Sequence, residues 1–94
     1  MTKNDLSILF QYLRMMAVAE IKIELKRGVT DPEGQNTKKA LELLGFKGIR
    51  SVRSIKFFEI ELESEGDEAV LACKEMCRKL LANPVIQRYS IHLK

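Results

Sequence analysis

Strict alternation of apolar and charged residues marks the first predicted strand. Between Ala19 and Lys26, the apolar positions are Ile21, Ile23 and Leu25, and the charged positions are Glu20, Lys22, Glu24 and Lys26. Successive side chains of a β-strand point to opposite faces, so a period of two predicts one buried face and one solvated face. The charged residues then form the solvated face.

A helix is predicted to follow, because Asp31-Pro32 is a strong helix start. An acidic residue can cap the first turn, and proline is favoured at the first helical position. The helix is expected to run to about Leu44, with an apolar stripe of Ala40, Leu41 and Leu44. Gly45 stands where a residue in the left-handed conformation commonly ends a helix.

The stretch from Ile49 to Glu63 is predicted to form one long, bent strand in the centre of the sheet. One face carries Val52, Phe58, Ile60 and Leu62, and the other carries Ile55 and Phe57. No Gly, Asn or Asp interrupts residues 50–63, so the alternative, a tight hairpin, lacks its usual turn residues. The second apolar face is available to another copy of the chain, which makes Ile55 and Phe57 candidate self-association residues.

A second helix is predicted from about Ser64 or Asp67, with an apolar stripe of Ala69, Cys73, Met76, Cys77 and Leu80. Asn83-Pro84 ends it, because the residue before a proline is disfavoured in the helical conformation. A last strand follows, in which Val85, Gln87, Tyr89, Ile91 and Leu93 alternate with Arg88, Ser90, His92 and Lys94.

A further amphipathic helix is predicted at the N-terminus, where apolar residues recur at helical spacing. They are Leu6, Leu9, Phe10, Leu13 and Met16, with Asn4 or Asp5 placed to cap the start. This helix is either a packing appendage or an extension that precedes a native start at Met15 or Met16. The chain is therefore divided into a helical extension over residues 1–17 and one domain over residues 18–94.

The order of these elements predicts a small α+β domain. Helices separate the strands, and only one face of each strand is convincingly apolar, so both helices are expected on one side of a small, mainly antiparallel sheet. This arrangement is a ferredoxin-like β-α-β-α-β layout. A chain of 94 residues suffices for one such core and leaves no surplus for a second domain.

The composition argues against a membrane protein and against a nucleic-acid-binding protein. No apolar run approaches the roughly 20 residues of a membrane-spanning helix, and no small-residue cleavage site follows the N-terminal cluster, so the chain is expected in the cytoplasm and off the membrane. Cys73 and Cys77 stand four apart on a predicted helix, which suits reduced, buried thiols. The net charge of +3 is mild and the basic residues are scattered, which argues against nucleic-acid binding.

Candidate catalytic groups are scarce. The single histidine, His92, stands near the C-terminus and is interpreted as a solvated surface side chain, without a nucleophile beside it. Glu59, Glu61 and Glu63 alternate along a predicted strand and are interpreted as a charged face. The glycines after Lys26-Arg27 match no Walker or dinucleotide fingerprint. No active site, cofactor site or metal site is expected in this chain alone.

Three stretches of sequence stand out as motifs. They are Lys26-Arg27-Gly28-Val29-Thr30-Asp31-Pro32-Glu33-Gly34, Ala40-Leu41-Glu42-Leu43-Leu44-Gly45-Phe46 and Leu80-Leu81-Ala82-Asn83-Pro84-Val85-Ile86. In this order and spacing they resemble the PurS family, the small subunits of phosphoribosylformylglycinamidine (FGAM) synthase. Val52-Arg53 with Lys56 resembles the family's Val-Arg-x-Gly-Lys segment, although Ile55 replaces the glycine and Gln87 stands at a commonly acidic position. The resemblance spans Val18 to Ile91.

The resemblance implies a non-catalytic subunit of the enzyme that converts formylglycinamide ribonucleotide to formylglycinamidine ribonucleotide in de novo purine biosynthesis. In this family, the synthetase subunit PurL is expected to carry ATP and Mg²⁺, and the glutaminase subunit PurQ releases ammonia. The chain is then expected to join PurL and PurQ, to assist ammonia transfer, and to form a homodimer or a homotetramer.

The motifs and the exposed basic residues supply the candidate partner contacts. They are Lys26, Gly28, Asp31, Pro32, Gly34, Arg53, Lys56, Asn83 and Pro84. The two prolines stand at element junctions, where fixed backbone angles hold a loop in one conformation, although each also serves to start or stop a helix. Two other functions are alternatives: a ligand-sensing regulatory domain of the same broad architecture, and a small RNA-binding module, which only the basic balance of the chain favours.

Overall fold

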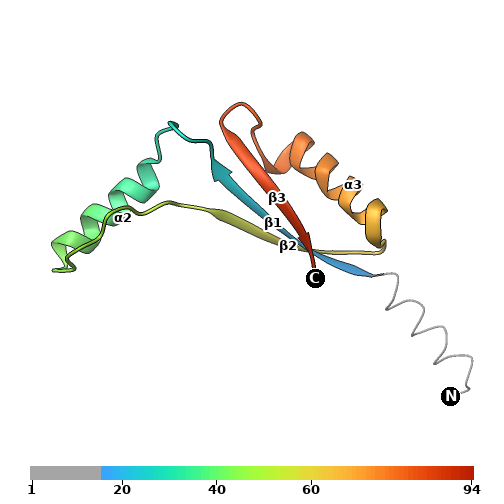
Figure 1. The fold of residues 1–94 in the computed structure, drawn as a ribbon, viewed down its shortest axis with the longest axis horizontal. Coiled ribbons are helices and arrows are strands. Elements are labelled where there is room, and N and C mark those ends of the chain that lie inside the picture. Colours follow the sequence, from blue (N-terminus) through green and yellow to red (C-terminus); the bar gives the residue numbers. More distant parts are fainter. Residues whose placement is uncertain (1–15) are drawn as a thin grey trace, which may run out of the picture.

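The computed structural model describes residues 16–94. The elements are β1 (Ala17–Leu25), α2 (Pro32–Leu43), β2 (Lys56–Leu62), α3 (Gly66–Met76), the short π-helix η1 (Cys77–Leu81) and β3 (Gln87–Leu93) (Figure 1). The predicted alternation of strands and helices is confirmed. The helix predicted at the N-terminus lies outside the described residues.

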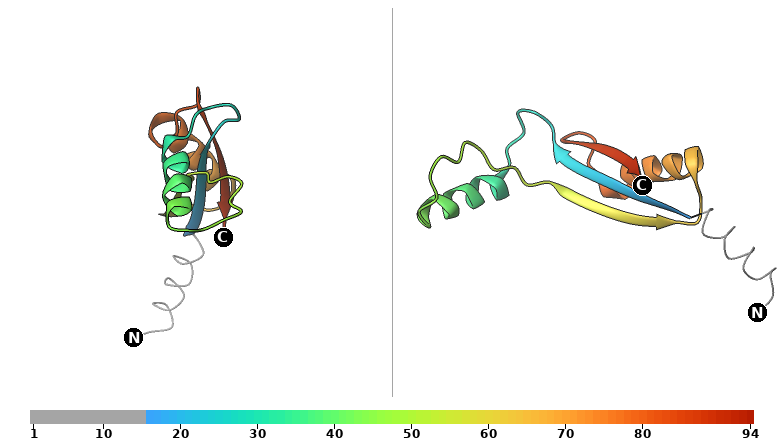
Figure 2. Two further views of the ribbon diagram at one scale, coloured as in Figure 1. Left: turned by 90° about the vertical axis from the view of Figure 1, so that its left-hand side faces the viewer. Right: turned by 60° about the horizontal axis from the view of Figure 1, so that its bottom comes forward.

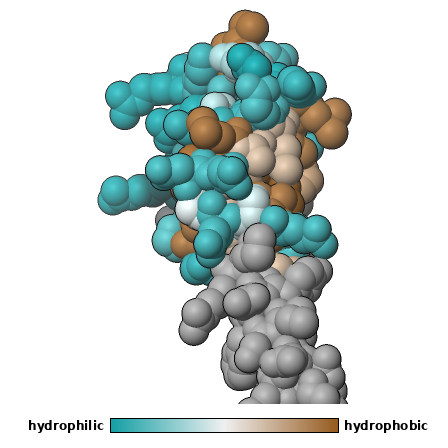
Figure 3. All heavy atoms as spheres, turned by 90° about the vertical axis from the view of Figure 1, so that its right-hand side faces the viewer, coloured by the Kyte–Doolittle hydropathy of each residue, from teal (hydrophilic) through white to brown (hydrophobic). Residues whose placement is uncertain are grey.

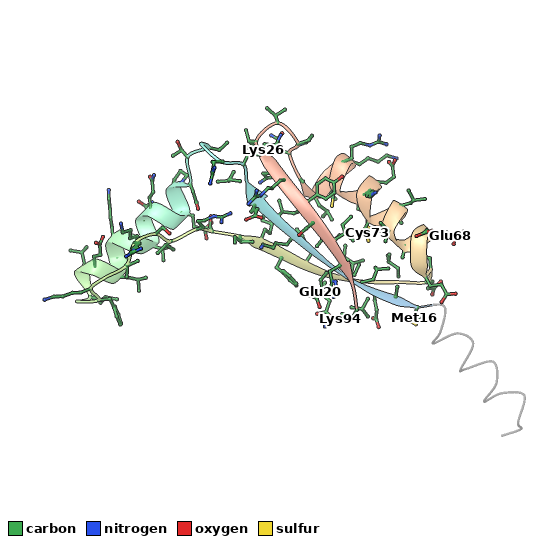
Figure 4. All side chains as sticks on the ribbon, viewed as in Figure 1. Met16, Glu20, Lys26, Glu68, Cys73 and Lys94 are labelled. Atoms are coloured by element: carbon green, nitrogen blue, oxygen red, sulfur yellow. The ribbon has the colours of Figure 1, made fainter. Side chains whose placement is uncertain are left out.

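β1 lies at the centre of a three-stranded antiparallel sheet of order β2-β1-β3. Ile21 pairs with Phe58 of β2 and with Ile91 of β3, so the three strands present apolar side chains at the same level of one face. The opposite face carries the charges that the sequence predicted. There, Lys94 Nζ lies 3.4 Å from a carboxylate oxygen of Glu20 and 3.5 Å from one of Glu59 (Figure 4).

The core forms where α3 packs across β1 and β3. Ile21 and Ile23 of β1 are buried against Cys73 of α3 and Cys77 of η1. Both cysteines are free thiols, and burial raises the pKa of each, so they stay neutral and pack as small hydrophobic side chains. The prediction of reduced, buried cysteines is confirmed.

α2 does not pack on the sheet of its own chain. It projects past the end of the sheet, and the chain returns alongside it to β2 (Figure 2). We call residues 32–55 the arm. The arm gives the molecule a radius of gyration of 19.3 Å, against about 12 Å for a compact chain of this length. The expectation that both helices cover one face of the sheet is therefore wrong within a single chain.

The strand predicted over Ile49–Glu63 is shorter than expected and lies at an edge of the sheet, not at its centre. The register pairs Lys56 with Ile23, and the residues before Lys56 form no ladder with another described strand because they belong to the arm. No hairpin forms between residues 49 and 63. The predicted faces are correct: Phe58, Ile60 and Leu62 pack against the core, whereas Phe57 is 56% exposed.

The end of the second helix departs from the predicted apolar stripe. The backbone N–H of Ala82 donates to the carbonyl of Cys77, five residues earlier, at 2.9 Å, which is the π-helical pattern. This wider turn brings Ala82 into the core and leaves Leu80 82% exposed. The prediction that Leu80 is buried is therefore wrong. Val85 was expected in the last strand, but it lies in a turn before β3.

Candidate functional site

Most of the candidate partner-contact residues gather at one end of the sheet, where the chain leaves β1 for the arm and later returns. The loop after β1, the start of α2, residues 52–54 and the loop before β3 meet there; we call this region the junction. Two clefts of about 430 and 550 Å³ lie in it. Pro32, Ile55 and Lys56 help to line the first, and Lys26, Arg27, Gly28, Arg53 and Arg88 help to line the second.

Asp31 is the polar centre of the junction. Its Oδ1 accepts hydrogen bonds from the backbone N–H of Gly34 at 3.0 Å and from Ser54 Oγ at 2.7 Å, and its Oδ2 accepts one from the backbone N–H of Ser54 at 2.8 Å. One carboxylate thus caps α2 and ties the returning segment to it. The Ser54 hydroxyl, followed by the N–H groups of Gly34 and Ser54, holds the pKa of Asp31 below its usual value.

Gly34 permits the close approach of α2 to the returning segment. It is buried, and a Cβ at this position would lie 2.4 Å from the carbonyl oxygen of Val52 and 2.6 Å from Asp31 Oδ2. Both distances are far below van der Waals contact, so any side chain here would push the two parts of the arm away from each other. The conformation is an ordinary helical one, and the requirement for glycine is therefore one of space.

Glu24, near the end of β1, makes a second tie. Arg53 of the arm donates to Glu24 Oε2, and Nε of Arg88 on β3 lies 3.1 Å from Glu24 Oε1. The hydrogen bond from Arg88 is the largest cause of a lowered pKa for Glu24, opposed in part by burial. The Glu24 side chain is only 13% exposed, whereas those of Arg53 and Arg88 are 54% and 60% exposed. The carboxylate therefore holds two guanidinium groups at the surface.

Lys26 joins the loop after β1 to the loop before β3. Its backbone N–H donates to the carbonyl of Ile86 at 2.9 Å, and its Nζ donates to the carbonyl of Pro84 at 2.6 Å. Asn83 holds the second loop from within, because its Oδ1 accepts a hydrogen bond from the N–H of Val85 at 3.1 Å. Figure 4 shows Lys26 between the two loops. The structure thus brings together Lys26, Asn83 and Pro84, three of the candidate partner contacts.

The remaining predicted residues lie around this centre. Gly28 adopts a φ of 87° in the turn after β1, which glycine reaches without steric strain. Lys56 begins β2 and is exposed. Ile55 borders the first cleft and is 44% exposed, and Phe57 lies opposite Lys22 on the charged face of the sheet. These positions leave all of them accessible to another chain.

Several residues of the junction were missed by sequence reasoning. Ser54 carried no signal, because a serine in an extended stretch is ordinary and its partner Asp31 is distant in sequence. Arg88 was predicted only as a solvated strand residue. Outside the junction, the exposure of Leu80 did leave a signal in the sequence, because the three successive apolar residues Leu80-Leu81-Ala82 cannot all face the core of a regular helix.

The two carboxylates at the centre of the junction, those of Asp31 and Glu24, are bound to other segments of the chain. Within residues 16–94, no group of three or more His, Cys, Asp and Glu side chains is arranged to hold a metal ion. No helix in the same part of the chain is long and apolar enough to cross a membrane. Asp31 accepts a hydrogen bond from Ser54, and Glu24 forms an ion pair with Arg88, so both carboxylates connect separate segments of the chain.

Comparison with known proteins establishes the family. The model of the PurS family, described as phosphoribosylformylglycinamidine (FGAM) synthase, matches residues 18–94. The chain belongs to the PurS family. A phosphoribosylformylglycinamidine synthase subunit PurS from Archaeoglobus fulgidus is 56% identical over 75 residues, which cover 79% of this chain and 94% of the relative. This PurS chain is accordingly a subunit of FGAM synthase, an enzyme of purine biosynthesis.

Solved PurS structures have the same fold. The crystal structure of Methanocaldococcus jannaschii PurS matches with a TM-score of 0.73 at 42% identity, over 83% of this chain and 95% of that chain. A chain in the structure of PurLQS from Thermotoga maritima matches with a TM-score of 0.74 at 28% identity, over 84% and 98%. The three-stranded antiparallel sheet with α2 and α3 is therefore a PurS fold.

Proposed function

We propose that this PurS chain is a non-catalytic bridge in FGAM synthase, which joins the synthetase subunit PurL to the glutaminase subunit PurQ. The match to PurS over residues 18–94 carries the proposal, and the likeness to a chain of PurLQS supports it. ATP and Mg²⁺ act on the large partner subunit, and this chain binds neither. It works in the cytoplasm, and its contact with both partners assists ammonia transfer.

The rigidity of the junction supports this docking role. Asp31 joins the two ends of the arm to each other, Glu24 joins the arm to β1 through Arg53, and Lys26 joins the two neighbouring loops. A surface that is already ordered loses less conformational entropy when a partner binds. The other candidate contacts stand on this ordered frame: Gly28, Pro32, Gly34, Arg53, Lys56, Asn83 and Pro84.

The arm supports self-association into a homodimer or homotetramer. Leu43, the last residue of α2, is 89% exposed, and Leu44 and Phe46, which follow the helix, are 75% and 57% exposed. Hydrophobic side chains so exposed on one element are suited to an interface. They have no place on the sheet of their own chain, because the arm extends beyond it.

The sheet offers a matching surface. α3 covers β1 and β3, and the apolar side chains of β2 remain only partly buried at the edge. The α2 helix of a second copy, laid along β2, would bury both surfaces and place two helices on one face. Two copies that exchange their α2 helices in this way would each complete the ferredoxin-like layout, with two helices on one face of the sheet. Ile55 and Phe57, exposed at the start of β2, would contact the second copy.

Glutamine-dependent formation of FGAM by purified PurL and PurQ from the same organism tests the bridge. We expect the rate to be low until this chain is added and then to rise at least tenfold. The rate with ammonium as nitrogen source should change far less, since free ammonia needs no transfer between subunits. Full glutamine-dependent activity in the absence of this chain would contradict the proposal.

A further inference from the structure

Two segments of chain join the arm to the rest of the molecule. One is the loop of residues 27–30 after β1, and the other is Ile55, which leads into β2. α3 packs on β1 and β3, whereas α2 makes no comparable contact with a strand in the described part of the chain. We call the sheet with α3 and η1 the body, and residues 27–30 with Ile55 the pivot. Figures 1 and 2 show the arm projecting from the body on these two segments.

The space around the pivot is not filled by a packed core. Clefts of about 430 and 550 Å³ lie there, and each is lined by residues of the arm and of the body. Within the pivot, Gly28 has a φ of 87°, and a Cβ at this position would meet no atom within 4 Å. Loop residues of this kind can absorb a rotation of one part of a molecule against another. The direction of the arm therefore depends on polar contacts across the pivot.

Glu24 and Arg53 make such a contact. Arg53 of the arm donates to Oε2 of Glu24 on β1. Nε of Arg88 lies 3.1 Å from Oε1 of the same carboxylate, and Nζ of Lys22 lies 4.0 Å from that oxygen. Because Arg88 and Lys22 belong to the sheet, they fix the carboxylate on the body. The Glu24 side chain is only 13% exposed, so salt screens its ion pairs less than those of a fully exposed carboxylate.

The two ends of the arm are joined at its base, so a contact at one end acts on both. Asp31 accepts hydrogen bonds from the N–H of Gly34 at 3.0 Å and from the N–H of Ser54 at 2.8 Å. Arg53 directly precedes Ser54 in the sequence. Its bond to Glu24 therefore holds the start of α2 as well as the returning segment.

We propose that Glu24 is a positioning residue for the arm, and that its ion pair with Arg53 is a latch that fixes the angle between the arm and the body. Release of the latch lets the arm turn about the pivot. The consequence for assembly rests on the proposed function. When two copies exchange their α2 helices, the angle of each arm sets the angle between the two sheets. A latched arm already has the direction in which the second copy receives it, so the latch reduces the conformational cost of self-association.

Single-molecule fluorescence energy transfer within one chain tests the latch. A donor and an acceptor on Lys39→Cys of α2 and Glu68→Cys of α3 report the angle of the arm. Both positions are exposed, and hydrophilic residues cover much of the molecule on the side opposite the arm (Figure 3). Cys73 and Cys77 stay unlabelled, because they are buried. The labelled chain is measured at subnanomolar concentration, and particles with one donor and one acceptor are selected, so that each reading comes from a single chain.

We expect one narrow distribution of transfer efficiency in the chain with an intact latch. The distribution should be broader or displaced in Glu24→Gln and in Arg53→Gln. Because the latch is one pair, the double variant should match either single variant and should not add the two changes.

Glu75→Gln is the matched control. Glu75 also forms ion pairs, but its partners are the exposed Arg78 and Lys79, away from the pivot. The distribution in this variant should be unchanged. A second labelled pair, on Glu68→Cys and His92→Cys within the body, should give the same distribution in every variant, which shows that the fold is intact.

The Kd for self-association, measured by sedimentation, is the second readout. It should rise about threefold in Glu24→Gln and stay unchanged in Glu75→Gln. A distribution of transfer efficiency that is as narrow in Glu24→Gln as in the intact chain would overturn the latch, whether or not the copies associate. A broader distribution with an unchanged Kd would overturn the link between the latch and assembly. If the unmodified chain never self-associates, the proposed homo-oligomer falls, whereas the energy transfer still decides the latch.

Discussion

Asp31 uses both carboxylate oxygens to join parts of the chain that lie 23 residues apart, and it also caps α2. The sequence predicted the cap, because Asp31-Pro32 is a local signal. It did not predict Ser54 as the second partner, because that bond depends on where the chain returns from the arm. At the scale of single residues, the sequence predicted local roles such as the helix cap, but it did not predict hydrogen bonds between distant segments.

Replacement of Asp31 by Asn tests the charge of this tie. Hydrogen bonds lower the pKa of Asp31 in the folded protein. The stabilisation is therefore fully present above the unfolded pKa of about 3.9 and is lost as the pH falls through the lower folded value. We expect Asp31→Asn to be less stable than the unmodified protein at neutral pH, and to lose less further stability on acidification. Urea unfolding at about pH 7 and about pH 3 measures both.

Asp67→Asn is the control for that experiment, since Asp67 is an exposed aspartate in the first turn of α3. This variant should keep the difference in stability between the two pH values. An Asp31→Asn protein with the same pH dependence as the unmodified one would show that the carboxylate charge does not hold the arm.

Gly34→Ala tests the space between α2 and the returning segment. The added methyl group would lie 2.4 Å from the Val52 carbonyl oxygen, so the arm must shift. We expect a loss of about 2 kcal/mol in the free energy of unfolding, typical of overpacking. Asn36→Ala, at an exposed site on the same helix, should stay within about 0.5 kcal/mol. Equal stability of both variants would mean that the approach is less close than described.

The elements of this PurS chain were easier to predict than their packing. The start of α2 at Pro32 and its end before Gly45 agree with the capping signals in the sequence. The apolar stripe of α2, however, did not reveal which sheet it covers, because a hydrophobic face is the same whether its partner is in the same chain or in a second copy. In the structure, Leu43 and Leu44 at the end of α2 are exposed beyond the sheet, so α2 covers no sheet of its own chain.

Leu43→Ser combined with Leu44→Ser tests the arm as the self-association element. Both side chains are exposed in one chain, so their loss should leave the fold intact and weaken only contact between copies. We expect the Kd for self-association to rise at least tenfold, since each buried leucine contributes about 1.5–3 kcal/mol. Sedimentation velocity over a range of concentrations measures it, and Lys47→Ser serves as a polar control. An unchanged oligomer in the double variant would exclude the arm.

The π-turn sets a second limit on prediction at the element scale. Helical periodicity assigned Leu80 to the core, because a period of 3.6 residues was assumed throughout the helix. One extra residue in the last turn shifted the inward position to Ala82. Asn83-Pro84 predicted where the helix ends, but it did not predict that the last turn is π-helical.

At the scale of the whole molecule, the chain is a small sheet with α3 on one face and an arm that projects from one end. The family resemblance predicted the role, and the residue patterns predicted the α+β class. The extended shape followed from neither, because an apolar helix face has the same sequence pattern whether or not it packs on the sheet of its own chain.

The mass of the assembly formed by the three purified chains tests the bridge most directly. Native mass spectrometry or sedimentation of PurL and PurQ should show separate proteins in the absence of this chain, and one complex that contains all three when it is added. If PurL and PurQ associate equally well without it, or if this chain stays a free monomer in the mixture, the protein is not a bridge.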